Sequence, residues 1–377
     1  MSSITSSVSS TSRYHPIKTL GSGAFGTVYL CQVQRGTAST SAHSEDDDLQ
    51  SEPQIVALKE TFQDMKYKNR EAEVLRLLKH PGIVKIFDIF YTKKRKSGRS
   101  KPATYLNIAM EYFPGTLHDL IERTSRKPRA QSRLSYQDIK WYTLQLFRTC
   151  GYLETLSLCH RDIKPQNILV DHSQKLIKMC DFGSAKKLLD SESNKHYICS
   201  RFYRAPELLC QSTHYSCSVD LWSTGCCMGE MYLAQPLFNG QNTKNQLHLI
   251  RNVLGEVPEH YPSKSRTDYA KRRGIASLQQ WRKTLRIKEN ARRLSHPSAS
   301  SSGGAQDHDL RFIRGILQYN PDQRFTLKQT LAHPYFADLV WPTKEDRLAM
   351  QQNGYSDIQW TPHEVAIIKT IRNDKKQ

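Results

Sequence analysis

The sequence predicts an α+β protein of two lobes, a small β-rich lobe followed by a larger helical lobe. Two observations lead to this prediction. Residues 14–110 hold short apolar runs rich in β-branched and aromatic side chains, whereas residues 116–339 carry apolar side chains at helical spacing. Between them, residues 111–115 contain an adjacent proline and glycine, which break regular structure. We interpret this short segment as a hinge between the lobes.

The two lobes together form a domain over residues 14–339, flanked by two segments of different character. Residues 1–13 are rich in Ser and Thr, and we expect them to be disordered. Residues 340–377 form a polar C-terminal tail. Three polar stretches interrupt the domain and are predicted to be inserted loops: those near residues 35–54, 93–102 and 295–308.

The individual elements follow from apolar spacing and from the residues that break it. Strands are predicted at residues 27–34, 55–59, 83–90 and 105–110, with a further strand leading into the glycine-rich run from Tyr14 to Leu20. Six helical segments are predicted, at residues 66–79, 117–122, 136–156, 219–233, 243–254 and 310–336. His80 and Pro81 end the first of these helices, because proline does not continue a helix.

Composition and termini exclude several classes of protein. The apolar set makes up 38% of the 377 residues, and no run approaches the eighteen apolar residues that a transmembrane helix needs. The N-terminus lacks the basic and apolar blocks of a secretory signal. The nine cysteines include no CxxC pair, so we expect reduced thiols rather than disulfides or a zinc site. We therefore expect no membrane partner and a cytoplasmic protein, with the nucleus as a second location.

The net charge of +19 raises the question of a nucleic-acid partner. The basic residues are concentrated in two stretches, residues 93–101 and residues 264–293. The first stretch contains no aromatic side chain on which a base could stack, and the second holds only Tyr269 and Trp281. Binding of nucleic acid is thus disfavoured. The basic stretches are interpreted as solvated loops, with nuclear import and acidic or phosphorylated substrates as the alternatives.

A glycine-rich run near the N-terminus predicts a loop that covers phosphates. Gly21, Gly23 and Gly26 form a GxGxxG pattern that lies between two strands rather than before a helix. Glycines let a backbone approach phosphate groups where a Cβ would obstruct it. The apolar strand that follows ends in Lys59, and Glu71 lies twelve residues later on a helix. These two residues are expected to form an ion pair near the phosphates.

The chemistry is carried by the run from His160 to Asn167 and by Asp181-Phe182-Gly183. Two carboxylates, a lysine and an amide lie within this short span. Phosphoryl transfer to a hydroxyl needs such a set: one carboxylate to orient the hydroxyl and accept its proton, and another, with the amide, to hold Mg²⁺ on the nucleotide phosphates. The runs match the catalytic-loop and D-F-G motifs of protein kinases.

Over residues 14–339 the sequence resembles a eukaryotic protein kinase, and within that superfamily glycogen synthase kinase-3. The similarity is most specific in the run from Tyr197 to Leu208, which reads YICSRFYRAPEL. Runs at residues 67–71, 159–167 and 180–186 support it. Arg204 before Ala205-Pro206-Glu207 is typical of the larger group that includes the cyclin-dependent and MAP kinases. The resemblance implies the two-lobed kinase fold and transfer of the ATP γ-phosphoryl group to Ser or Thr.

The resemblance also implies roles for individual residues. The catalytic set is Asp162, Lys164, Lys59 and Glu71, and the Mg²⁺ ligands are Asn167 and Asp181. The ATP-binding set is Leu20, Gly21, Ser22, Gly23, Ala24, Phe25, Gly26, Thr27, Val28, Ala57, Lys59, Glu111, Phe113, Leu169 and Cys180. Tyr197 corresponds to the family's activation-loop phosphotyrosine. Glu207 and Arg324 are expected to form a buried ion pair, and Asp220 to brace the catalytic loop.

Three cations form the sharpest prediction from the resemblance. Arg70, Arg161 and Lys186 are expected to bind a phosphoserine already present on the substrate, four residues C-terminal to the target hydroxyl. The prediction assumes that the cations meet without a carboxylate partner. Pre-phosphorylated proteins, with scaffold proteins, are then the expected partners. The alternatives are a proline-directed kinase of the same group without a priming requirement, cations that bind only acidic side chains, and a catalytically inactive scaffold.

Overall fold

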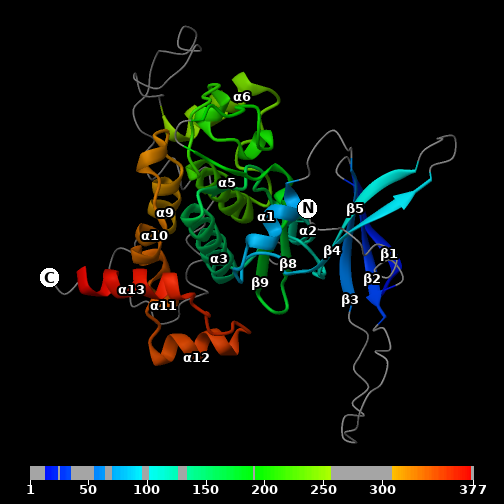
Figure 1. Ribbon diagram of the computed structural model, residues 1–377. Coiled ribbons are helices and arrows are strands. Elements are labelled where there is room, and N and C mark those ends of the chain that lie inside the picture. Colours follow the sequence, from blue (N-terminus) through cyan, green and yellow to red (C-terminus); the bar gives the residue numbers. More distant parts are fainter. Residues whose placement is uncertain are drawn as a thin grey trace, which may run out of the picture. The chain divides into compact units, whose positions relative to one another are not determined.

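A computed structural model describes residues 13–23, 26–34, 55–63, 70–95, 102–125, 134–189, 192–255 and 308–374. The chain divides into two compact units (Figure 1). The first contains residues up to Leu78 and residues Val84–Phe113, and the second contains Lys79–Ile83 and everything from Pro114 onward. The change of unit after Phe113 lies inside the segment interpreted as a hinge. A β-rich first unit and a helical second unit agree with the predicted two-lobed fold.

The first unit is built on an antiparallel sheet of five strands in the order β1-β2-β3-β5-β4. The strands are β1 (Tyr14–Gly23), β2 (Gly26–Val33), β3 (Ile55–Phe62), β4 (Ile86–Lys94) and β5 (Ala103–Glu111), and the unit's helix is α1 (Glu71–Leu77). Aliphatic and aromatic side chains of these strands form a core in which the rings of Tyr14 and Phe90 stack at 5.5 Å. This core holds β1, β2, β3, β4 and β5 together.

The glycine-rich run forms the turn between β1 and β2, as predicted from its place between two strands. Gly23 pairs with Gly26 across the turn. Gly26 has a φ of +126°, and a Cβ at this position would lie 2.1 Å from the carbonyl oxygen of Glu60. Glycine is therefore required here by backbone conformation and by the close approach of β3. Ala24 and Phe25 lie outside the described residues.

Strand β4 differs from its prediction at both ends. It was expected at residues 83–90 but runs from Ile86 to Lys94, where Lys94 pairs with Ala103. The first two lysines of the basic stretch are thus strand residues and not part of a loop, because pairing with β5 decides the end of the strand. Ile83 leaves this sheet altogether and forms a bridge with Met179 in the second unit.

The second unit consists of helices with two small sheets. The helices are α2 (Leu117–Ser125), α3 (Tyr136–Thr155), α4 (Pro206–Leu209), α5 (Ser218–Leu233), α6 (Thr243–Leu254), α9 (His308–Ile316), α10 (Leu327–Ala332), α11 (Ala337–Val340), α12 (Lys344–Gln352) and α13 (Pro362–Asp374). One sheet has the order β6 (Gly115–Thr116), β8 (Ile168–Asp171), β9 (Leu176–Met179), and the other pairs β7 (Leu158–Cys159) with β10 (Lys186–Lys187). The helices predicted at residues 117–122, 136–156, 219–233 and 243–254 are confirmed.

Helices α3 and α5 lie side by side in the core of this unit (Figure 1). The Ser135 side chain accepts the amide of Asp138 and caps the start of α3. Trp222 on α5 is completely buried. Beside it, the Arg324 guanidinium donates from both Nη atoms to the Glu207 carboxylate, at 2.7 Å each. The predicted buried ion pair is therefore confirmed.

The C-terminal tail contains more structure than its polar sequence indicated. Helices α12 and α13 follow the domain, and α13 packs against α10 (Figure 1). Tyr355, in the segment between α12 and α13, is buried, and its hydroxyl donates to the Asp138 carboxylate at 2.7 Å. Few apolar side chains of the tail are buried, which is why their periodicity gave no clear signal. Polar contacts with α3 attach the tail instead.

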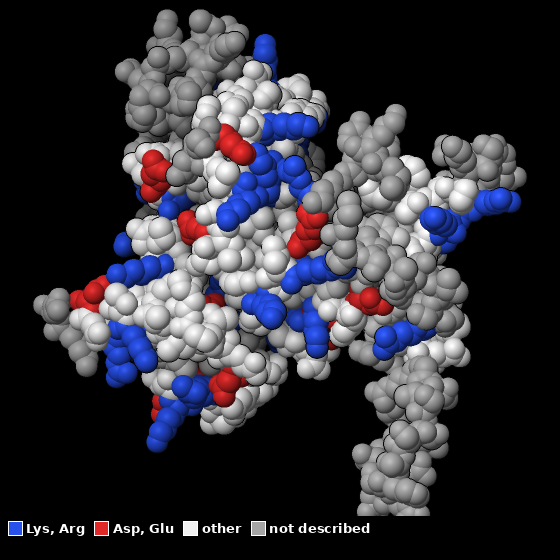
Figure 2. All heavy atoms as spheres, in the orientation of Figure 1, with Lys and Arg blue, Asp and Glu red and all other residues white. Residues whose placement is uncertain are grey.

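Several predictions fall on residues outside the described ranges. These are the predicted disorder of residues 1–12, the predicted insertions at residues 35–54 and 96–101, the second basic stretch at residues 264–293 and the predicted loop at residues 295–307. Over the described parts of the chain no helix is long and apolar enough to cross a membrane. Each of the nine cysteines has a free thiol. On the face drawn in Figure 2, basic side chains are spread in separate groups with acidic side chains between them.

Candidate active site

The Asp162 carboxylate is the centre of the catalytic loop, and donors surround it. Lys164 Nζ lies 2.7 Å from Oδ2, and Asn167 Nδ2 donates to the same oxygen at 3.1 Å. The other oxygen accepts both the hydroxyl and the backbone amide of Ser200, at 2.9 and 3.1 Å. The Ser200 hydroxyl is also 3.2 Å from Lys164 Nζ. A carboxylate and an ammonium group thus hold one hydroxyl between them.

Asp220 fixes the backbone that leads to this carboxylate. Its side chain accepts the amides of His160 and Arg161 at 2.6 and 3.0 Å. Burial raises the pKa of Asp220, while the charge of His160 and the two amide bonds oppose that rise. Arg161 has a φ of 67°, a left-handed conformation that costs a non-glycine residue about 1–3 kcal/mol unless its surroundings hold it. The predicted bracing contact of Asp220 is therefore present.

The buried His160 ring connects the catalytic loop to the segment that carries Asp181. Its centroid lies 4.6 Å from that of Phe182, and its Nε2 lies 3.0 Å from the carbonyl oxygen of Cys180. The Cys180 amide in turn donates to the carbonyl oxygen of Asn167 at 3.0 Å. These contacts bring Asn167 and Asp181 together on neighbouring backbone segments.

The two residues predicted to bind Mg²⁺ offer the oxygen donors that this ion prefers. The Asn167 amide nitrogen donates to the Asp162 backbone oxygen at 2.9 Å, which turns the amide oxygen away from that bond. Asp181 adopts a left-handed backbone conformation with a φ of 61°. One amide oxygen and one carboxylate on adjacent segments fit a hard cation that keeps several water ligands.

In the first unit, the ion pair predicted between Lys59 and Glu71 is present. Lys59 Nζ lies 2.7 Å from Glu71 Oε1, and the Glu71 side chain is only 5% exposed. Lys59 reaches this position from β3, where it pairs with Val28 on one side and Ile108 on the other. Both charges are thus presented next to the strands of the glycine-rich turn.

The residues predicted to bind ATP are divided between the two units. Those of the first unit lie on strands or directly after one: Leu20, Gly21, Ser22 and Gly23 on β1, Gly26, Thr27 and Val28 on β2, Ala57 on β3, Glu111 at the end of β5 and Phe113 just beyond it. In the second unit, Leu169 lies on β8 and Cys180 follows β9. The Cys180 thiol is half-buried and donates to the Asn167 carbonyl oxygen at 3.4 Å.

Comparison with known proteins decides the family. The family model described as the protein kinase domain matches residues 14–336. This chain belongs to the protein kinase family. It is 35% identical over 329 residues to the protein kinase gsk31 of Schizosaccharomyces pombe, across 87% of this chain and 76% of that protein. It is 34% identical over 343 residues to glycogen synthase kinase 1 of Pyricularia oryzae, across 91% of this chain and 77% of that protein.

The family match and the two relatives together show that the protein is a serine/threonine kinase similar to glycogen synthase kinase-3. Such a kinase is a phosphotransferase that uses ATP. Sequence analysis gave no role to Ser200, although it lies in the run that carries the resemblance. The signal available was a hydroxyl directly before Arg201 in the activation segment, the stretch between Asp181 and Glu207. A sequence pattern does not show that this hydroxyl forms a hydrogen bond with Asp162, thirty-eight residues earlier in the chain.

The activation segment of the kinase presents Tyr197 to solvent. Its side chain is 72% exposed, and the Arg204 guanidinium lies 4.5 Å from the ring centroid. Arg204 also donates to the carbonyl oxygens of Ile198 and Cys199 at 2.7 and 2.8 Å. Arg201, a second arginine close to Tyr197 in the sequence, donates to the Gln241 carbonyl oxygen at 2.6 Å.

The cations predicted to bind phosphate differ in their surroundings. Arg161 donates to the Ser184 carbonyl oxygen at 2.7 Å, and Lys186 Nζ lies 2.8 Å from the Glu192 carboxylate and 2.6 Å from Asn194 Oδ1. The assumption that no carboxylate partners these cations is therefore wrong for Lys186. The chain folds back after Lys186, so that Glu192, six residues later, contacts the lysine. The spacing of the residues alone did not indicate this contact. Arg70 belongs to the first unit and is exposed before α1.

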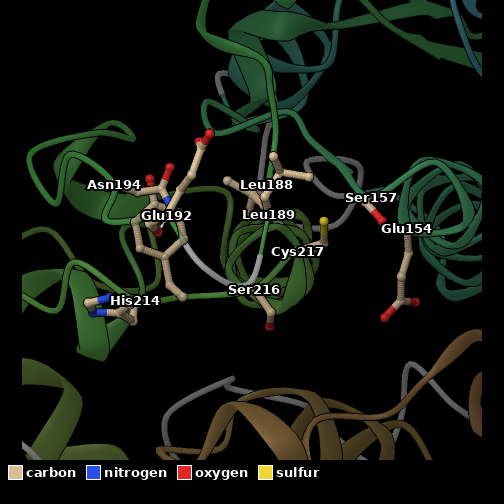
Figure 3. A pocket seen from close by; sticks show the side chains of 10 residues that line it. Glu154, Ser157, Leu188, Leu189, Glu192, Asn194, His214, Ser216 and Cys217 are labelled. Carbon is tan, nitrogen blue, oxygen red and sulfur yellow. Dashed lines mark hydrogen bonds between the residues drawn. The ribbon is translucent and has the colours of Figure 1, made fainter.

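A cavity of about 330 Å³ in the second unit is lined in part by Glu192 and Asn194, the two side chains that Lys186 contacts (Figure 3). Its walls come from the end of α3, the activation segment and the turn before α5, and it is lined by Glu154, Ser157, Leu188, Leu189, Glu192, Asn194, His214, Tyr215, Ser216 and Cys217. Burial raises the pKa of Glu154, and Glu192 is the partner of Lys186. Two carboxyl groups on its walls make this cavity a poor site for an anion.

Proposed function

We propose that this kinase transfers the γ-phosphoryl group of MgATP to Ser or Thr in proteins that already carry a phosphoserine four residues C-terminal to the target. Asp162 accepts the proton of the substrate hydroxyl, and Lys164 stabilises the transferring phosphoryl group. The observation that carries this assignment is the Ser200 hydroxyl held 2.9 Å from Asp162 and 3.2 Å from Lys164. A substrate hydroxyl would meet the same two groups, at distances suited to general base catalysis.

ATP is expected to lie under the glycine-rich turn of β1 and β2. A Cβ on Gly21 or Gly23 would meet no atom within 4 Å, so the packing of the chain itself does not require glycine at either position. Glycine there leaves room for phosphate groups against the backbone. Lys59, oriented by Glu71, would contact the α- and β-phosphates. Ala57, Val28 and Leu169 are assigned to the adenine ring, and the backbones of Glu111 and Phe113 to its hydrogen bonds.

Asn167 and Asp181 would hold Mg²⁺. The bound ion would neutralise charge on the β- and γ-phosphates. The chain contributes the position of the two ligands, because the Cys180–Asn167 backbone bond joins their segments at 3.0 Å. His160 contributes to this position by packing and has no role in proton transfer.

The priming phosphate is assigned to Arg70, Arg161 and Lys186. The Lys186–Glu192 contact does not exclude such a site, because the Glu192 side chain is 46% exposed. Exposed ion pairs contribute only about 0–1 kcal/mol. A phosphoserine brings close to two negative charges and three acceptor oxygens, and arginine is well suited to bind it. Such a substrate phosphate would displace Glu192 and fix the register of the peptide.

A peptide library tests the proposal directly. One parent peptide is made with phosphoserine at each offset from the target and without any phosphoserine, and transfer from radiolabelled ATP is measured. We expect the highest kcat/KM with phosphoserine at the fourth position C-terminal. Equal rates for all members, with a preference for proline after the target, would favour a proline-directed kinase without priming. No transfer to any member would favour an inactive scaffold.

Partners and location follow from this proposal. Pre-phosphorylated proteins are the substrates, and scaffold proteins would bring them to the kinase. The enzyme would act in the cytoplasm, and the basic stretch at residues 93–101 would carry it into the nucleus. No role for a membrane or for nucleic acid is proposed.

A further inference from the structure

The C-terminal tail makes a buried ionic contact with the core helix α3. Arg148 on α3 donates from Nε and Nη2 to the two carboxylate oxygens of Glu364 on α13, at 2.6 and 2.8 Å. Nη2 also donates to the Gln359 carbonyl oxygen at 2.6 Å, and the guanidinium lies 4.7 Å from the centroid of Trp360. Glu364 is 2% exposed. A bidentate pair at this depth fixes both partners in one geometry.

Glu364 also faces His80, which belongs to the segment Lys79–Ile83. Its Oε1 lies 3.8 Å from His80 Nε2. That nitrogen is buried and has no hydrogen-bond partner. Burial opposes ionisation of Glu364, but its contacts with His80 and Arg148 outweigh this effect and hold its pKa well below the usual range. These contacts therefore favour the ionised form of the tail carboxylate that faces the His80 ring.

The segment Lys79–Ile83 is attached to the second unit at several points. The His80 ring stacks on Tyr152 of α3 with centroids 5.0 Å apart, and the Tyr152 hydroxyl accepts the Lys79 amide at 2.9 Å. His80 Nδ1 accepts the amide of Gly82 at 3.0 Å. A Cβ on Gly82 would lie 1.9 Å from the Thr149 hydroxyl oxygen, so the segment packs directly on α3.

From this segment the contacts continue to the proposed metal ligand. The Gly82 carbonyl oxygen accepts the amide of Met179 at 2.8 Å, and Ile83 forms a bridge with the same residue. Met179 ends β9 and precedes Asp181 by two residues. Glu364, His80, Gly82 and Met179 thus form a continuous series of contacts from the tail to the start of the Asp181 segment, all within the second unit.

We propose that Glu364 is a positioning residue for the metal-binding carboxylate Asp181. It acts by holding His80 and the segment Lys79–Ile83 against β9. The inference rests on the proposed assignment of Asp181 to Mg²⁺. Loss of the Glu364 charge would release the His80 ring, loosen the bond between Gly82 and Met179, and widen the range of positions that Asp181 samples. The C-terminal tail would then be part of the catalytic apparatus and not only a covering of α3.

The test uses two variants and a matched control in the full chain. Glu364→Gln removes the charge, and His80→Asn keeps an acceptor for the Gly82 amide but removes the nitrogen that faces Glu364. Asp374→Asn alters the same helix at an exposed pair with Lys328, whose side chains are 57% and 51% exposed. Hydrogen exchange is measured for the peptide of residues 176–181. Binding of Mn²⁺, a paramagnetic substitute for Mg²⁺, is measured with a non-hydrolysable ATP analogue.

We expect both test variants to exchange the Met179 amide faster and to bind Mn²⁺ about threefold or more weakly, less than the 10- to 100-fold typical of residues that contact a metal ligand directly. The Mg²⁺ concentration for half-maximal activity should rise in parallel, with the KM for peptide unchanged. The control should behave as wild type. A lower melting temperature with unaltered hydrogen exchange and unaltered Mn²⁺ binding would overturn the inference. If Glu364→Gln does not fold, the same measurements on His80→Asn decide the question.

The failure of this inference is distinguishable from the failure of the proposed function. If Asp181→Asn abolishes Mn²⁺ binding while Glu364→Gln and His80→Asn leave it unchanged, only the positioning role is wrong. If Asp181→Asn itself binds Mn²⁺ like wild type, the metal assignment on which both proposals rest is wrong.

Discussion

The buried pair of Glu207 and Arg324 allows a quantitative test of the fold. The Arg324 and Glu207 side chains are 0% and 5% exposed, and their two hydrogen bonds are 2.7 Å long. Two unit charges at about 4 Å interact by about 4 kcal/mol at an effective dielectric constant near 20. Replacing Arg324 by Ala leaves a buried carboxylate without its partner, which typically costs about 3–5 kcal/mol. We therefore expect Arg324→Ala to lose about 4 kcal/mol of unfolding free energy.

Urea unfolding measured by tryptophan fluorescence provides the assay, because Trp222 lies 5.3 Å from the Arg324 guanidinium. Lys328→Ala provides the control, since its pair with Asp374 is exposed and worth about 0–1 kcal/mol. The double variant Glu207→Gln with Arg324→Met removes both charges and should recover part of the loss. A loss below about 1 kcal/mol for Arg324→Ala would refute the reasoning that an uncompensated buried charge dominates.

Three further predictions concern the catalytic and regulatory residues. Asp181→Asn should abolish Mg²⁺-dependent transfer with an unchanged circular dichroism spectrum, and rates like those of wild type would end the metal assignment. Active enzyme should carry phosphate on Tyr197, which peptide mapping would detect. Tyr197→Phe should lower turnover, because Arg201 and Arg204 would lose the phosphate that orders the substrate groove. Full activity of the unmodified protein would show that this phosphate is dispensable. Neutralising four basic residues of the stretch 93–101 should change localisation in cells with little effect on peptide kinetics, whereas a large fall in turnover would place the stretch at the substrate groove.

The grouping of the candidate site residues could be predicted because the proposed chemistry restricts residue types at fixed spacing. Phosphoryl transfer needs a base, cations and oxygen ligands, and few other demands produce Asp162, Asn167 and Asp181 in that order. The ion pair of Lys59 and Glu71 could be predicted for the same reason. The long helices of the second unit were predictable because α3 and α5 carry many apolar side chains that are buried along most of their length.

The features that sequence analysis missed depend on contacts between distant parts of the chain. Strand β4 extends to Lys94 only because Ala103 of β5 lies opposite, and no local preference favours two lysines in a strand. The tail is attached by polar contacts, among them the Glu364–Arg148 ion pair and the Tyr355–Asp138 hydrogen bond, rather than by an apolar stripe. The Lys186–Glu192 pair depends on the path of a loop. Tertiary structure, and not propensity, decides each of these features.

Recognition of a priming phosphate is tested most directly by one ratio. This is the kcat/KM of a primed peptide divided by that of its unprimed form, measured in wild type, Arg70→Ala and Arg76→Ala. Arg76 is an exposed control on the helix that follows Arg70. We expect a large ratio in wild type and in Arg76→Ala, and a ratio about tenfold or more lower in Arg70→Ala, because a charged hydrogen bond contributes about 1.5–3 kcal/mol. A wild-type ratio near one, or a ratio that Arg70→Ala leaves unchanged, would contradict the account.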